Sequence, residues 1–295
     1  MSALLLLGGM LFVIHALHGQ LADLTAAAVE IHPLIFPALA LLATLTVLVT
    51  ASLHAEIVAR TGSAPIDFAR VRYAYAASQV ARYVPGKVFG VLLETQMLAP
   101  AVGVGQVVTA TLLQTLLAYA WAGAAAVIIL GTLGLDSAWP GLLAPVVLAL
   151  LWLAQRNRWP ERMRSTLGTG TNATPAPARS TDSSRRSARR STLLLAIQWL
   201  PFFAMWILLA AADHGIAAAS WLGASYLLAS IGGSLLVLVP SGLVVREAAF
   251  VWLGGLYGLP ASSLVAWAVV VRLALTFADV LAVPVLWIVS RLRAH

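Results

Sequence analysis

The stretch "RYVPGKVFGVLLE", residues 82–94, decides how the rest of the chain is interpreted. It places Arg82, Lys87 and Glu94 around a Pro-Gly pair in an otherwise apolar sequence. Proline lacks a backbone N–H and its ring clashes with the preceding turn, so a helix stops there. A soluble core would not hold these charges, and an ordinary spanning helix would not hold the break. The stretch therefore predicts a broken helix inside a membrane protein.

The composition points the same way. Hydrophobic residues make up 61% of the 295-residue chain and charged residues 10%, and the mean hydropathy is +0.91. Soluble domains carry about 25% charged residues, so this chain cannot cover itself with a polar surface. Its apolar runs reach the roughly 20 residues that a helix needs to cross a bilayer. Segments of alternating polarity, typical of a transmembrane β-barrel, are absent from the sequence. We predict an all-α polytopic membrane protein.

The apolar runs predict about six spanning helices and two re-entrant helical hairpins. The first half, 1–155, holds one re-entrant segment near 73–98, and the second half, 192–295, holds another near 218–257. Between them, 156–191 is rich in Ser, Thr, Arg and Pro and is predicted to be a flexible linker. The predicted spans are about 2–17, 34–55, 104–132, 141–155, 192–212 and 261–290.

The net charge of +7 is concentrated in that linker and at the ends of spans. Lys and Arg accumulate on the cytoplasmic side of membrane proteins, so the linker and the C-terminus are predicted to be cytoplasmic. The loops 20–32, 133–139 and 212–217 carry no Lys or Arg and should lie outside. This placement of charge argues against nucleic acid as a partner. The linker is either a solvated tether or a segment attracted to anionic lipid.

The two broken segments look like copies of each other. The first reads "VPGKVFGVLLETQMLAP" and the second "VPSGLVVREAAFVWLGGLYGLP". Pro85 and Pro240 are 155 residues apart, and Gly103 and Gly258 have the same separation. Three predicted spans separate the breaks, so the two halves should be inverted across the membrane. Paired breaks in inverted halves indicate the binding site of a transporter, because each new helix starts with free N–H groups in mid-membrane.

Charged residues near the breaks sharpen this prediction. Arg246 and Glu247 follow the second break, and Arg272 and Asp279 lie seven residues apart on one face of the last span. A charge within a membrane costs about 2.5–3.5 kcal/mol and usually faces a cavity or a partner. Arginine also suits the two parallel bonds that a phosphate accepts.

Purely structural interpretations remain open for each of these charges. Arg272 and Asp279 could neutralise each other, and Arg246 with Glu247 could form a structural pair. Lys87 could extend to the cytoplasmic interface, and Glu94 could lie at an interfacial hairpin end.

No catalytic motif or metal-ligand pattern is present, and we expect neither an enzyme nor a cofactor. The chain lacks the nucleophile elbow, the phosphate-binding loop and the dinucleotide fingerprint. It has six histidines and no cysteine, and no cluster of ligands accompanies the histidines in sequence. A metal site needs three or four ligands.

Residues 78–94, "SQVARYVPGKVFGVLLE", and 238–260, "LVPSGLVVREAAFVWLGGLYGLP", resemble the two signature regions of the lysylphosphatidylglycerol synthase transmembrane, or flippase-like, family. The resemblance covers most of the chain and implies a bacterial inner-membrane protein that moves lipid between leaflets. Ser241 and the long Arg/Ser linker depart from the family pattern. No soluble synthase domain follows the last span, so lysyl transfer is not expected. The positions that carry over are Tyr83, Pro85, Gly86 and Lys87, and Pro240, Gly242, Arg246 and Glu247.

The sequence thus leads to one expectation about function. The protein should translocate a phosphate-bearing lipid, either a phospholipid or a polyprenyl-phosphate-linked glycolipid, with the membrane and that anionic lipid as partners. Homo-oligomers are compatible with the sequence. The alternatives are a membrane-integral lipid-modifying transferase and a non-catalytic accessory or scaffold protein in envelope assembly. The predicted substrate-binding set is Arg82, Tyr83, Pro85, Gly86, Lys87, Glu94, Pro240, Gly242, Arg246, Glu247, Arg272 and Asp279.

Overall fold

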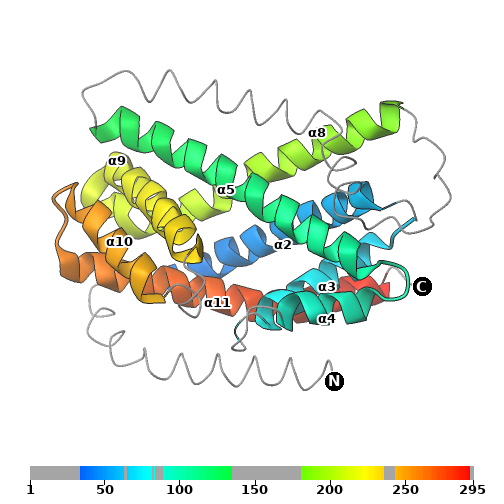
Figure 1. The fold of residues 1–295 in the computed structure, drawn as a ribbon. Helices are drawn as coiled ribbons and strands as arrows, with labels where there is room; N and C mark the ends of the chain where they lie inside the picture. The colour runs from blue at the N-terminus through cyan, green and yellow to red at the C-terminus, as the bar shows by residue number, and fades with distance from the viewer. Residues whose placement is uncertain are drawn as a thin grey trace.

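The computed structural model describes residues 34–62, 65–81, 83, 89–134, 181–235 and 243–292. All regular elements in these ranges are α-helices, which confirms the predicted all-α class. They are drawn in Figure 1. In chain order they are α2 (Ile35–Thr61), α3 (Phe68–Ala81), α4 (Phe89–Leu98), α5 (Val104–Gly134), α8 (Thr181–Ile197), α9 (Trp199–Leu235), α10 (Leu243–Gly255) and α11 (Ala261–Leu292).

Four helical stretches in the described ranges are long and apolar enough to cross a bilayer, which indicates a membrane protein. They match the predicted spans at 34–55, 104–132 and 261–290, and the third contains the span predicted at 192–212. The predicted spans at 2–17 and 141–155 lie outside the described residues. The four stretches are Ile35–Thr61, Val104–Leu133, Arg186–Ser234 and Ala261–Leu292.

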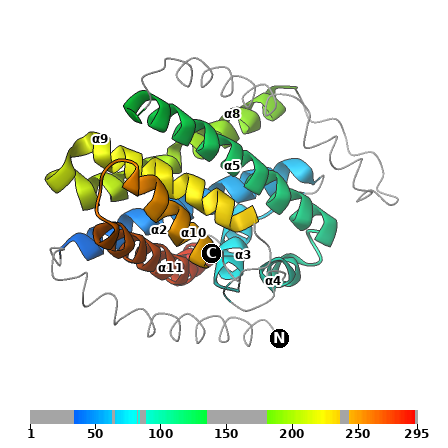
Figure 2. The ribbon, with the colours of Figure 1, turned by 60° about the vertical axis from the view of Figure 1, so that its left-hand side comes forward.

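Helix α2 lies at the centre of the arrangement. It packs against α3, α5, α8, α9 and α11, and both ribbon views show it enclosed by these helices (Figures 1 and 2). Its hydroxyl side chains bond carbonyls one turn back: Thr44 to Ala40 and Thr50 to Thr46, each at 2.7 Å. A hydroxyl paired in this way is satisfied within its own helix. The threonines of α2 can therefore lie in an apolar bundle without partners on other helices.

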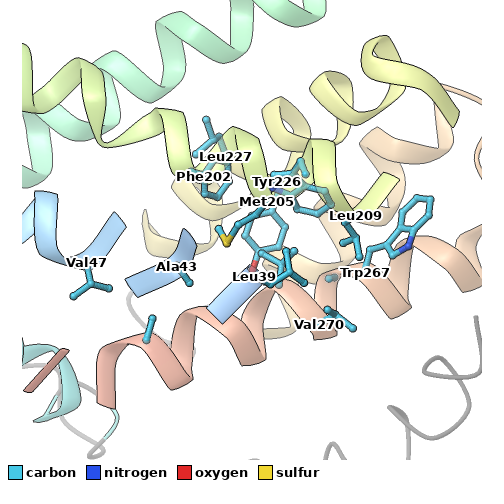
Figure 3. Packing of buried hydrophobic residues seen from close by; sticks show 14 of the residues in the cluster. Leu39, Ala43, Val47, Phe202, Met205, Leu209, Tyr226, Leu227, Trp267 and Val270 are labelled. Carbon is cyan, nitrogen blue, oxygen red and sulfur yellow. The ribbon is translucent and has the colours of Figure 1, made fainter. Parts of the chain in front are cut away.

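The main core forms where α2, α9 and α11 meet. Leu39 and Ala43 of α2 lie against Phe202 and Met205 of α9 and Val270 of α11, as Figure 3 shows. Alanines are frequent in this core, and such small residues let membrane helices approach closely.

Large apolar side chains cover the outside of the bundle. Leu116, Trp252, Phe277 and Ile288 are all exposed. An exposed apolar surface of this kind marks contact with a membrane or a partner. On a chain with four membrane-length helices, hydrocarbon is the environment that these side chains require.

Helix α9 consists of two arms that meet at Gly215. That residue has φ +81° and ψ 165°, a backbone conformation that interrupts the helix and that glycine adopts readily. The arms pack on each other: the Trp206 and Tyr226 rings lie 5.3 Å apart. The break falls in the turn expected at 212–217. Residues 218–235 of the second arm are the first part of the segment 218–257 that is predicted to be re-entrant.

The described part of the linker differs from expectation. Residues 181–191, predicted as flexible, form the first turns of α8. The error has a physical cause, because Arg190 reaches the buried carboxylate of Glu56 and so gains a partner that composition does not reveal. The remainder of the predicted linker, 156–180, lies outside the described residues.

Each of the two predicted breaks is followed by the same order of elements. After the first break come the short helix α4, a turn at Gly103 and the long helix α5; after the second come α10, a turn at Gly258 and α11. Gly258 has φ +81°, which favours glycine at this turn. The breaks themselves, at 84–88 and 236–242, lie outside the described residues.

The contact between the arms of α9 predicts a difference between two glycine substitutions. A Cβ on Gly223 would lie 2.9 Å from Phe203 Cδ1, whereas a Cβ on Gly232 would have nothing within 4 Å. Overpacking of this kind costs about 1–3 kcal/mol. Gly223→Leu should therefore unfold at a lower temperature in detergent than Gly232→Leu, which gains the same helix propensity. Equal melting temperatures for the two variants would contradict this packing.

Candidate functional site

A cluster of three charged side chains joins α10 to α11. Arg246 Nη2 donates to Glu247 Oε1 at 3.0 Å, and Arg272 Nη1 donates to the same oxygen at 3.3 Å. The side chains are 18%, 26% and 15% exposed for Arg246, Glu247 and Arg272. Two guanidinium groups thus share one carboxylate in a largely buried position. One positive charge is left over.

The cluster also holds polar atoms that have no hydrogen-bond partner. Among the described residues, Arg246 Nε, Glu247 Oε2 and the Tyr226 hydroxyl are buried and unpaired. The Arg246 guanidinium lies over the Tyr226 ring, 5.3 Å from its centroid, and this contact fixes its position. Buried polar atoms are normally paired, so these three atoms could accept water or a ligand as a partner.

Helix α11 connects this cluster to the end of α3. Two turns beyond Arg272, Asp279 accepts a hydrogen bond from the Tyr83 hydroxyl at 2.8 Å, and Thr276 lies 3.3 Å from the same hydroxyl. Tyr83 immediately precedes the first break. One face of α11 therefore contacts both halves. Its Asp279 binds Tyr83, before the first break, and its Arg272 binds Glu247, after the second break. Arg272 pairs with Glu247 and does not neutralise Asp279.

Glu94 lies in a separate cluster in the first half. Its Oε1 is 2.6 Å from His54 Nε2, and the two side chains are 2% and 0% exposed. His54 also contacts Gln114 of α5 and stacks on Tyr75 of α3, with ring centroids 4.6 Å apart. Glu94 is therefore buried between helices.

A third buried carboxylate binds the basic helix α8. Glu56 is 4% exposed and forms an ion pair with Arg190 at 2.9 Å. Ser187 also donates to Glu56, at 3.4 Å. This contact attaches the end of the linker to the central helix.

The structure places five of the twelve predicted site residues in two separate groups. Arg246, Glu247 and Arg272 form one group, and Tyr83 and Asp279 form a second group on the same helix α11. Glu94 lies with His54, in contact with neither group. The remaining predicted residues lie outside the described residues: Arg82, Pro85, Gly86, Lys87, Pro240 and Gly242.

Sequence reasoning missed the uncharged and histidine partners of these charges. His54 lies on α2, forty residues before Glu94, and Tyr226 lies twenty residues before Arg246. No local spacing joins residues so far apart. The available signal was His54, a polar residue inside the predicted span 34–55, where it requires a partner.

In comparisons with known proteins, no family model, curated protein or solved structure matches the chain.

The Tyr83–Asp279 contact can be tested by stability. Tyr83→Phe removes a hydrogen bond to a carboxylate that is 3% exposed, and bonds to charged groups are worth about 1.5–3 kcal/mol. We expect thermal unfolding in detergent to occur at a lower temperature. Tyr119→Phe is the control, because the described residues offer no hydrogen bond to its hydroxyl. If Tyr83→Phe is as stable as Tyr119→Phe, the contact does not hold the first half to α11.

Proposed function

We propose that the protein is a lipid flippase that moves a phosphate-bearing lipid between the leaflets of a membrane. The lipid is a phospholipid or a polyprenyl-phosphate-linked glycolipid, and its phosphate binds the cluster of Arg246, Glu247 and Arg272. The acyl chains stay in the bilayer while the headgroup moves between the helices.

The observation that carries the proposal is the unbalanced charge of this cluster. Two arginines face one carboxylate, and the Arg246 Nε–H has no acceptor among the described residues. A phosphodiester supplies the missing negative charge and the missing acceptor together, and arginine binds phosphate with two parallel bonds. Within an apolar bundle such an interaction is stronger than at a protein surface.

The proposal includes two inverted halves, each with a re-entrant hairpin. The repeated order of break, short helix, glycine turn and long helix supports this arrangement. Contacts of α11 with both halves support a site at their junction: Asp279 meets Tyr83, and Arg272 meets Glu247. Ion and substrate sites of secondary transporters lie at such junctions, formed by discontinuous helices.

The resemblance of residues 78–94 and 238–260 to the flippase-like family adds a location and partners. We place the protein in a bacterial inner membrane as a multi-pass protein, with the linker and C-terminus in the cytoplasm. Its partner is an anionic lipid. The exposed arginines of α8, Arg186 and Arg189, suit the anionic surface of the inner leaflet.

The test is lipid translocation in proteoliposomes. A fluorescent phosphatidylglycerol and a labelled polyprenyl-phosphate-linked sugar serve as two probes, and a membrane-impermeant quencher reports each leaflet. The intact protein should translocate at least one probe. Arg246→Gln should slow it by about tenfold or more, since a charged hydrogen bond is worth about 1.5–3 kcal/mol.

Arg291→Gln is the matched control. It makes the same change of charge on an arginine at the end of α11 that contacts Trp287 and not the cluster, and it should translocate at the normal rate. Normal translocation by Arg246→Gln would remove the site assignment. Covalent modification of a lipid by the intact protein, without translocation of either probe, would establish the transferase alternative.

A further inference from the structure

A second ionisable site, His54 and Glu94, lies in the first half of the chain. It takes no part in the proposed phosphate binding. His54 of α2 and Glu94 of α4 are almost completely buried, and their Nε2 and Oε1 atoms lie 2.6 Å apart. Gln114 of α5 and Tyr75 of α3 complete the surroundings. Four helices therefore meet at one histidine–carboxylate pair.

The hydrogen-bond partners around the pair favour one arrangement of its hydrogens. The Gln114 amide Nε2 faces two acceptors, the Thr50 carbonyl at 3.3 Å and the Tyr75 hydroxyl at 3.4 Å. The amide oxygen is thereby left for His54 Nδ1, which must carry a hydrogen to donate to it. The hydrogen of a neutral His54 is thus already used at Nδ1.

It follows that the contact between Nε2 and Oε1 needs a second proton. Without that proton, the lone pair of His54 Nε2 would face the carboxylate oxygen of Glu94 at 2.6 Å, and the two would repel each other. With that proton, the pair is either imidazolium with carboxylate or imidazole with carboxylic acid, and each of these forms is neutral overall. The geometry of the pair therefore suits a site that holds one shared proton.

We propose that the His54–Glu94 pair is a proton-binding site that drives the transport cycle. This role rests on the proposed function, which lacks a source of energy without it. On release, the shared proton passes to water and leaves an imidazole with its hydrogen on Nδ1 and a carboxylate. The site then has a net charge of −1. Buried histidine and carboxylate residues within membranes often form such proton relays.

Other charged groups near the pair are engaged elsewhere. On α2, Glu56 binds Arg190 of α8, and on α11, Asp279 binds Tyr83. Arg70 of α3 binds the carbonyls of Met97 and Ala99. From α3 the titratable group that faces the pair is Tyr75, and from α5 the polar group is Gln114. Three more ionisable groups lie on α2 and α3: Arg60, Arg72 and Tyr73.

Loss of the proton would change which conformation is favoured. Among the described residues no Lys or Arg contacts Glu94, so its carboxylate would be a buried charge without a cation. That state is costly in an apolar interior, and separation of α4 from α2 relieves it by admitting water. α4 follows the first break directly. Protonation therefore favours the closed position of α4, and deprotonation an open one.

The proton site can be tested without any transport. Histidine labelled with ¹⁵N is observed by NMR and buried carboxyl groups by infrared difference spectra, in purified protein between about pH 5 and 8. Either the His54 ring signal or the Glu94 carboxyl signal should titrate in the wild type, because the shared proton belongs to one of these two side chains. It should be lost in Glu94→Gln. Glu56→Gln, which removes another buried carboxylate of the same bundle, should keep it.

The proposal would be overturned if neither His54 nor Glu94 titrated over this range, or if the signal assigned to the pair still titrated in Glu94→Gln. A variant that misfolds would lose the ring contact between His54 and Tyr75. The unchanged spectrum of the remaining histidines and the thermal melting curve identify a folded Glu94→Gln.

Coupling is measured by the equilibrium distribution of the fluorescent phosphatidylglycerol probe under a pH gradient. For one proton per lipid, a gradient of one pH unit shifts the ratio between leaflets by up to about tenfold. Glu94→Gln should show no shift, while Glu56→Gln should respond as the wild type does. A full shift in Glu94→Gln, or none in a translocating wild type, would overturn the coupling role.

The two proposals fail differently. If the wild type translocates neither lipid probe, the proposed function is wrong, while the spectroscopic titration still decides whether His54 and Glu94 exchange a proton. If translocation is normal and the titration is absent, the flippase stands and the proton site falls.

Discussion

A charged group inside a bilayer needs a partner, and the described structure depends on this constraint. Three buried or half-buried carboxylates of the bundle have cationic or histidine partners from another helix: Glu56 with Arg190, Glu94 with His54 and Glu247 with Arg272. Each contact crosses between helices that apolar packing alone would leave free to slide, because membrane helices gain little hydrophobic energy from one another. These charged contacts therefore help to set how the helices that they join lie against each other.

The charge clusters differ in how completely they are satisfied. The His54 cluster is closed: ring nitrogens, amide and carboxylate oxygen all have partners among the described residues. The Arg246 cluster is open, with a guanidinium N–H, a carboxylate oxygen and a tyrosine hydroxyl left unpaired. A closed network suits a proton, which needs no space. An open one suits a ligand that brings its own acceptors, as a phosphate does.

Helix α11 gives the two halves a common element. It contacts α2 and α3 of the first half as well as α10 of the second, and it holds Arg272 and Asp279 on one face. Helix α4 packs on α3 and α5, and α10 packs on α9 and α11. Because α3 and α11 contact each other, a coupling between the proposed proton and phosphate sites would pass through these two helices, without direct contact between the clusters.

The amino-acid sequence by itself determined the helical class, the long apolar helices and the positions of the charges that matter. Hydropathy, and the cost of a charge in hydrocarbon, depend on the residues themselves, so Arg246, Glu247, Arg272 and Glu94 could be selected without coordinates. Only the tertiary structure decided their partners. Asp279 binds Tyr83 instead of Arg272, Glu94 binds His54, and Arg190 of the helical segment 181–191 binds Glu56. These pairings join residues 40 to 196 positions apart, and such separations are set by helix packing, which no local pattern encodes.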